Sequence, residues 1–221
     1  MAQLDVYRDW LNIKETERPL NHYQLLRLKQ FEDNTATIRK HYRQLNAHVR
    51  KYASGEYMEQ SQTLLNELAK AMLCLTDAER KREYDATLGR KSSGPGQSRT
   101  FAEIMLGNKL IDQAQLKRAK SYADAVGLDI HQAVLQQKLA EPADITLAYA
   151  ESIGLPFVDL NDIGIDENLV VQVPPQLGRQ YSFVPVMIAD GMLMMASPEP
   201  INPDVEEEMR LRFGMQIRSV I

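Results

Sequence analysis

Residues 184–221 read VPVMIADGMLMMASPEPINPDVEEEMRLRFGMQIRSVI, and this stretch decides the fold of the end of the chain. Its first part holds two apolar runs, VPVMIAD from residue 184 and GMLMMAS from residue 191. Asp190-Gly191 joins them, and this dipeptide favours the tight turn of a β-hairpin because both residue types tolerate a positive φ angle. The first part therefore predicts two antiparallel strands.

The second part of the stretch predicts a helix and a closing strand. Asn202 can cap a helix that runs to Phe213, and Gly214 can end it. Residues 216–221 then predict a strand, and PFVDL from residue 156 predicts another one upstream. A small α/β layer is therefore expected in this part of the chain.

An internal repeat precedes the α/β layer. An offset of 29 residues places Ile104 on Ala133, Met105 on Val134, Leu106 on Leu135, Leu110 on Leu139, Leu116 on Ile145 and Ala119 on Ala148. Each copy predicts a short helix, a turn and a second helix, which Asp112 opens in the first copy and Glu141-Pro142 in the second. Self-similarity at a fixed offset indicates two copies of one unit, here a tandem pair of helical hairpins.

Helical periodicity also dominates the N-terminal half. Apolar residues recur at steps of three and four from Ile38 to Tyr52, which predicts a helix over about 36–52. The same spacing from Leu65 to Leu75 predicts a second long helix that packs antiparallel to the first. Two short helices are predicted upstream, one around Leu4, Tyr7 and Leu11 and one over Tyr23–Leu28.

Residues 90–99 read RKSSGPGQSR and contain no large apolar side chain. Because this composition is typical of a flexible linker, we predict an all-α domain over 1–89 and an α+β domain over 100–221. Residues 1–98 hold 16 basic and 13 acidic residues, whereas the remainder holds 10 and 17. The net charge of −7 on the second part argues against its wrapping nucleic acid. Each half is expected to keep its own core and to fold independently.

The segments HYQLLRL, IRKHYRQL and LLNELAKAMLCLTDAERKREYD fall within about residues 20–88 and resemble the J domain of DnaJ-type co-chaperones. The resemblance implies an all-α, J-like helical bundle, in which Thr76 and Glu79 fit the capping box of the last helix. A J domain acts through a His-Pro-Asp tripeptide after its second helix, where this sequence has Arg50-Lys51-Tyr52. Co-chaperone activity is therefore not carried over, and a divergent co-chaperone ranks third among the functional hypotheses.

Basic residues concentrate in the predicted helix over 36–52 and just after it. They are Arg39, Lys40, Arg43, His48, Arg50 and Lys51. Two interpretations stay open: a solvated helix face, which charge runs usually are, or a docking surface for a protein partner, as in a J domain. Nucleic-acid binding is the weakest interpretation, because the neighbouring aromatic residues Tyr42 and Tyr52 already belong to the apolar stripe.

The segments FAEIMLGNKLIDQAQLKRA, AYAESIGLPFVDL and VPVMIADGMLMMASPEPINPDVEEEMRLRFGMQI lie between residues 101 and 221. They resemble the N-terminal domain of the GspE/PulE/MshE family, the ATPases that power type II secretion and type IV pili. The sequence contains no GxxxxGK[ST] phosphate loop and no evident catalytic constellation. We therefore expect no enzyme, but a non-catalytic cytoplasmic adaptor whose protein partner belongs to such a secretion or pilus system.

A subfamily of these domains binds cyclic di-GMP through repeats that begin with Arg-Leu-Gly and carry a further glycine. The resemblance carries this site to Phe101, Ala102 and Lys109 in the first repeat and to Ile130, His131 and Lys138 in the second. Both arginines and all the glycines are missing at these positions. A nucleotide sensor is therefore the alternative hypothesis, and binding of cyclic di-GMP is disfavoured.

The composition sets further limits on the chemistry. Cys74 is the only cysteine and the four histidines are scattered, so no Cys/His cluster has the spacing of a zinc site. No metal site and no cofactor are expected, and Cys74 is expected to pack inertly on an apolar helix face. No stretch approaches the roughly 18 apolar residues of a membrane span, and the acidic N-terminus is unlike a signal peptide. This pattern predicts a cytoplasmic protein without a membrane span.

Overall fold

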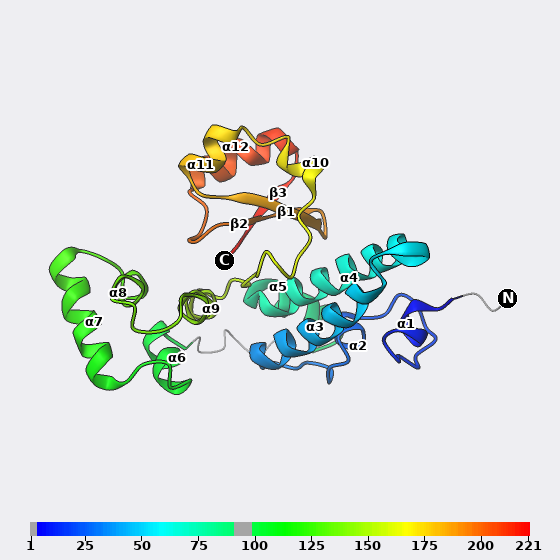
Figure 1. Cartoon of the computed structure of the whole chain (residues 1–221), viewed down its shortest axis with the longest axis horizontal. Helices are drawn as coiled ribbons and strands as arrows, with labels where there is room; N and C mark the ends of the chain where they lie inside the picture. The colour runs from blue at the N-terminus through cyan, green and yellow to red at the C-terminus, as the bar shows by residue number, and fades with distance from the viewer. Residues whose placement is uncertain (1–3, 91–98) are drawn as a thin grey trace.

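The computed structural model describes residues 4–90 and 99–221, so most of the predicted linker lies outside the described residues. Helices of the N-terminal half lie at one end, and two helical hairpins lie at the other (Figure 1). A three-stranded sheet with its own helices sits between and above them. The prediction of a helical part followed by a helical and α/β part is confirmed at this level. Within the described residues, no helix combines the length and apolar character that crossing a membrane requires.

The N-terminal half is built on an antiparallel pair of long helices. Its elements are α1 (Val6–Asp9), α2 (His22–Leu25), α3 (Thr35–Val49), α4 (Met58–Thr76) and α5 (Ala78–Thr87), with 3-10 turns at Arg50–Tyr52 and Gly55–Tyr57 between α3 and α4. The predicted helix over 36–52 thus ends in a 3-10 turn. The predicted cap of α5 was one residue off, because Asp77 accepts hydrogen bonds from the backbone N–H groups of Glu79 and Arg80. The Thr76 hydroxyl instead donates back to the Met72 carbonyl.

The repeat predicted from sequence appears as two equivalent hairpins. The first consists of α6 (Phe101–Gly107) and α7 (Gln113–Val126), the second of α8 (Ile130–Gln136) and α9 (Pro142–Ile153). The bounds of α6 and α8 differ by the predicted offset, and Asp112 and Glu141 cap the second helix of each copy. The two copies share one core, which contains Phe101, Ile104, Met105, Ile111, Leu116, Ala119, Val134, Ile145 and Ala148.

The α/β layer consists of a sheet with one antiparallel and one parallel pairing. Its strands are β1 (Val184–Ala189), β2 (Met192–Ala196) and β3 (Gln216–Val220), in the order β1-β2-β3. The predicted hairpin turn is confirmed, with φ of 52° at Asp190 and 75° at Gly191. The helices are α10 (Glu167–Val170), α11 (Pro175–Gln180) and α12 (Pro203–Phe213), of which only α12 was predicted. No strand forms over 156–160, although the Val158 N–H donates to the Ile221 carbonyl at 2.7 Å.

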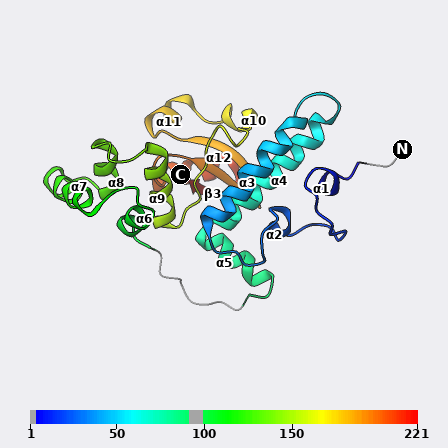
Figure 2. The same cartoon turned by 60° about the horizontal axis from the view of Figure 1, so that its bottom comes forward.

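Both faces of the sheet are covered. On one face, Leu193, Met195 and Ile217 pack against α10, the turn after α10, and α12. On the other face, apolar side chains join the core of the N-terminal helices: Val186, Met187, Ala189, Met194, Ala196 and Val220. Figure 1 shows α3 and α4 below the sheet, and in Figure 2 they cross in front of it. The expectation of two independent cores is therefore wrong, because the largest core contains residues from both halves.

Candidate interaction and ligand sites

The corner between α4 and α5 is the polar centre of the contact between the two halves. Asp77 follows α4 directly and is fully buried. Arg218 of β3 donates two hydrogen bonds to its carboxylate, from Nε and Nη2, each at 2.7 Å. The Arg218 Nη1 atom reaches Glu79 at 2.9 Å. One carboxylate thus caps α5 and fixes β3, and the pKa of Arg218 is raised by its hydrogen bonds to Asp77.

Two further contacts join the halves at the same corner. Arg80 of α5 is buried, and its guanidinium donates to the Asp190 carboxylate in the β1–β2 turn. The Ala78 N–H donates to the Gly154 carbonyl at 3.0 Å, just after α9. Gly154 has φ of 72°, and a Cβ there would lie 3.1 Å from the Ala78 side chain. A glycine is therefore required where α9 meets α5.

The basic residues of α3 do not form one exposed face. Arg39 is buried, and burial lowers its pKa to about 10. Arg43 lies 3.7 Å from the Asp162 carboxylate of the C-terminal half, and His48 makes an edge contact with the ring of Tyr52. Lys40, Arg50 and Lys51 are exposed. Arg43 is exposed as well, so four of the six basic residues keep the accessibility that the predicted docking surface needs.

A cavity of about 290 Å³ lies between α3, α4 and the loop that follows residue 158. The Tyr42 hydroxyl and the Asn46 amide both donate to the Asp162 carbonyl at its edge, at 3.0 and 2.9 Å. Arg50, Gln62 and Asn66 also line it. The cavity therefore belongs to the contact between the halves, and its mixed apolar and polar lining includes one exposed cation, Arg50.

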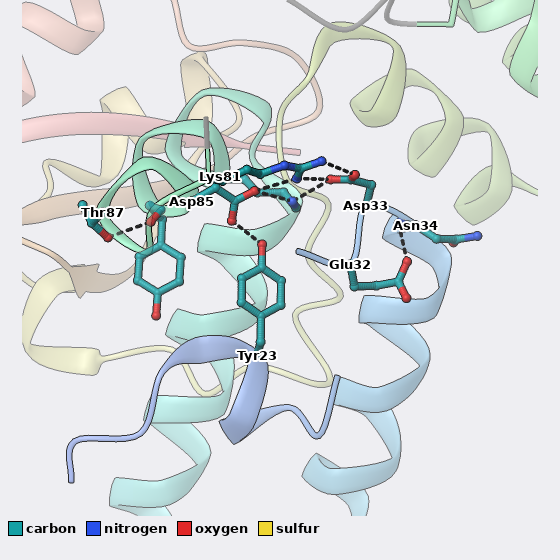
Figure 3. Close-up of polar contacts among 9 residues, drawn as sticks. Tyr23, Glu32, Asp33, Asn34, Lys81, Asp85 and Thr87 are labelled. Carbon is teal, nitrogen blue, oxygen red and sulfur yellow. Dashed lines mark hydrogen bonds and ion pairs between the residues drawn. The ribbon is translucent and has the colours of Figure 1, made fainter. Parts of the chain in front are cut away.

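A network of polar side chains fixes the end of α5 against α2 and the loop before α3 (Figure 3). The Tyr23 hydroxyl donates to the buried Asp85 carboxylate, which also accepts from Lys81 at 2.8 Å and from Arg90 at 2.9 Å. Lys81 and Arg90 both reach Asp33 as well. Burial opposes ionisation of Asp85, but the hydrogen bonds outweigh burial and lower its pKa. The hydrogen bond from Arg90 is the main cause of the lowered pKa of Asp33.

This network includes the first residue of the predicted linker. Arg90, its first residue, is tied to Asp33 and Asp85. At its other end, Arg99 pairs with Glu151 of α9. Residues 91–98 lie outside the described residues. The two described ends of the predicted linker are thus anchored by ion pairs.

The repeat positions proposed for nucleotide binding are split between core and surface. Phe101 is buried, and Ala102 and Ile130 are partly buried against the same core. Lys109 and Lys138 are exposed and hold left-handed backbone, with φ of 56° and 50°. Each follows the first helix of its hairpin, so the two lysines lie on different turns. Their backbone has the conformation that glycine favours.

His131 is the predicted site residue with the most contacts. Its ring stacks on Tyr149, with centroids 3.8 Å apart, and meets the edge of Phe101 at 6.3 Å. Its Nε2 atom lies 3.7 Å from the Glu199 carboxylate, and burial lowers its pKa. Phe101 and His131 are therefore brought together as packing residues, whereas Lys109 borders a separate open hollow beside Asp112 and Gln113.

Sequence reasoning missed the contact residues at the junction. Asp77, Arg80, Asp190 and Arg218 were not singled out as a group, because they come from distant parts of the chain. A partial signal existed for Arg218, which is a charged residue between Ile217 and Ser219 in a predicted strand. No comparable signal marks the burial of Arg39, which lies between Ile38 and Lys40 on a basic helix.

Comparisons with known proteins found a matching domain family and several similar proteins. The MshEN domain family matches residues 153–221. The type IV pilus assembly ATPase PilB of Myxococcus xanthus (strain DK1622) is 23% identical over 121 residues, which make up 55% of this chain and 21% of PilB. Bacteriophage adsorption protein B of Escherichia coli (strain K12) is 24% identical over 123 residues, or 56% of this chain and 16% of that protein. The chain thus spans about a fifth or less of the length of these relatives.

Two solved structures are also similar. The structure of MshE with cdg covers 56% of this chain and 89% of its own, with 16% identity and a TM-score of 0.46. The N-terminal domain of XpsE covers 57% of this chain and 90% of its own, with 23% identity and a TM-score of 0.41.

Proposed function

We propose that this chain is a non-catalytic adaptor for a type II secretion or type IV pilus system, because the MshEN domain family matches residues 153–221. The likeness to PilB supports this context. The sequence holds no phosphate loop of the GxxxxGK[ST] type, which ATP hydrolysis by such a motor needs. The chemistry that remains is recognition of a protein partner.

The observation that carries the proposal is the outer layer of the sheet, formed by α10–α12. The opposite face of the sheet is covered by the N-terminal helices, so this layer is the free side of the MshEN domain (Figure 1). Val171, just after α10, is 81% exposed, and Leu211 of α12 is 74% exposed. Leu211 lies between Arg210 and Arg212, which pair with Glu207 and Glu208 one turn earlier, and α12 keeps a net negative charge from four acidic and two basic residues. An apolar anchor on a helix of net negative charge suits a protein surface that is basic near an apolar pocket.

The test is direct binding between the full chain and the purified protein components of the same cell's secretion or pilus system. We expect one component to bind the chain and L211D to abolish that binding. V126D is the matched control, because Val126 of α7 is an exposed apolar residue, at 54%, outside the outer layer. Binding that survives L211D would rule out the outer layer, and failure of every component to bind would overturn the adaptor role.

A second candidate is recognition of a cyclic dinucleotide by the tandem hairpins. The observation in its favour is that Lys109 and Lys138 keep the left-handed backbone at equivalent positions of the two repeats. The family match begins at residue 153, after both lysines. Calorimetry with cyclic di-GMP distinguishes the candidates: micromolar binding that is lost in K109A or K138A would make sensing the primary function, and absence of heat would leave the adaptor role.

For the N-terminal helices we propose a J-like module that supports the MshEN domain and does not act as a co-chaperone. Its support is the shared core, to which α2, α3 and α4 contribute together with the sheet. The turn after α3 contains Arg50-Lys51-Tyr52, and Tyr52 stacks on Trp10 at 4.3 Å. Stimulation of a DnaK-type ATPase by the full chain, lost on replacing these three residues, would contradict this assignment.

A further inference from the structure

Three side chains with metal-binding atoms meet at the contact between the halves. His22 begins α2, Cys74 lies near the end of α4, and Asp190 lies in the turn between β1 and β2. One donor atom of each residue lies within 4.8 Å of the other two. The three residues are far apart in sequence, so no motif with the spacing of a zinc site announces them.

We propose that His22, Cys74 and Asp190 form a binding site for a zinc ion. A thiolate, an imidazole and a carboxylate together suit zinc better than magnesium or calcium, which prefer oxygen ligands. Three protein ligands leave the fourth position of a tetrahedral zinc ion to water or to another ligand. The observed spread of 4.8 Å between donor atoms requires only a small approach of the side chains.

The surroundings of His22 favour metal binding. Its ring stacks on Tyr84 with centroids 4.2 Å apart, and its backbone N–H donates to the Tyr84 hydroxyl at 2.9 Å. These contacts fix the ring, as partners around a metal ligand commonly do. Burial lowers the pKa of His22, so the imidazole is neutral at physiological pH and can donate an electron pair to the ion.

Two features of the site weaken its affinity for the ion. Burial raises the pKa of the Cys74 thiol to about 12, so binding must release the thiol proton to solvent as the S–Zn bond forms. The Arg80 guanidinium donates to the Asp190 carboxylate and places a positive charge beside the site. Zinc must therefore displace this ion pair, which makes Arg80 a residue that weakens binding.

Zinc at this place would join three elements of different halves. His22 and Cys74 belong to the N-terminal helices, whereas Asp190 belongs to the sheet. An ion that binds only the folded chain stabilises it in proportion to the logarithm of its concentration. The inference concerns the contact between the halves and is independent of the proposed adaptor role.

The experiment titrates Co²⁺, as a spectroscopic substitute, into the full chain without oxygen, and then adds Zn²⁺ in competition. A near-ultraviolet charge-transfer band from a thiolate–cobalt bond is expected, and Zn²⁺ should remove it. C74S should lose the band. D190N should bind Co²⁺ at least about tenfold more weakly, and R80M about tenfold more tightly. H48Q is the matched control, because His48 lies on α3 outside the cluster.

D190N keeps the turn, because asparagine tolerates the same left-handed backbone, and its amide oxygen can still accept a hydrogen bond from the buried Arg80. A second readout is thermal unfolding, which excess Zn²⁺ should shift upward in the unmodified chain and in H48Q but not in C74S. Cobalt binding without the charge-transfer band, or equal affinity in the unmodified chain and D190N, would overturn the proposal.

Discussion

Replacing Arg218 by methionine tests whether the polar corner holds the two halves together. Methionine keeps most of the apolar stem, so the change mainly removes the guanidinium. Asp77 then loses two hydrogen bonds of 2.7 Å while it stays fully buried. Removing one partner of a buried ion pair typically costs about 3–5 kcal/mol. Asp77 still accepts two backbone N–H groups, and the Arg218 side chain is 23% exposed, so water can partly replace it.

We therefore expect R218M to lower the free energy of unfolding by about 2–4 kcal/mol. The control is R210M, because Arg210 pairs with Glu207 on the surface of α12 and such pairs contribute about 0–1 kcal/mol. Urea unfolding followed by circular dichroism at a fixed protein concentration measures both variants. If R218M loses no more stability than R210M, the corner does not carry the contact, and the reasoning from burial fails.

Other expectations follow from the same contacts. A fragment of residues 101–221 should be less stable than the same residues in the full chain and should bind a hydrophobic dye, because removing the N-terminal helices exposes one face of the sheet. Equal stability of the fragment and the full chain would contradict the shared core. In the folded chain the pKa values of Asp33 and Asp85 lie below the unfolded value of about 3.9. Both carboxylates therefore stabilise the fold above that pH, and this contribution is lost as the pH falls through their folded pKa values. D85N should accordingly lose less stability between pH 7 and pH 3 than the unmodified chain. K138G should raise the free energy of unfolding by up to about 1 kcal/mol, because glycine adopts the left-handed backbone of this position without steric strain. An unchanged or lower free energy in chemical unfolding would show that the backbone at Lys138 is not strained. The purified chain should release no phosphate from ATP in a coupled assay, and turnover above a buffer blank would contradict the absence of a motor.

Local patterns in the sequence predicted most helices and strands because each has its own signals. The repeat offset located α6 and α8 correctly, and Asp190-Gly191 located the hairpin. The strand expected over 156–160 does not form, because its pairing depends on a distant segment that no local sequence pattern predicts. Two backbone hydrogen bonds join Pro156 and Val158 to Ile221, the last residue of the sequence, and this pairing is too short to form a strand.

The candidate sites were harder to predict than the fold because they depend on contacts between distant segments. Arg39 was grouped with the exposed cations of α3, yet it is buried. Cys74 was correctly expected to be buried, but sequence alone could not bring His22 and Asp190 to it. The composition of residues 90–99 predicted separate domains. Alternation of side chains along β2, however, places the apolar residues Met194 and Ala196 on one face of the sheet, and another part of the chain must cover that face.

The contacts within the chain decide which surfaces remain for a partner. Apolar side chains on one face of the sheet are already buried against α2, α3 and α4, so a partner cannot use that face without separating the halves. The outer layer has no such cover: Leu211 is exposed and stands in an acidic helix. Because exposed charges are screened within about 10 Å at 0.1 M salt, association through this layer should slow as salt rises, whereas its apolar anchor should keep the bound complex intact. If residues 153–221 recognise a partner as proposed, the N-terminal helices leave only the outer side of the sheet for it.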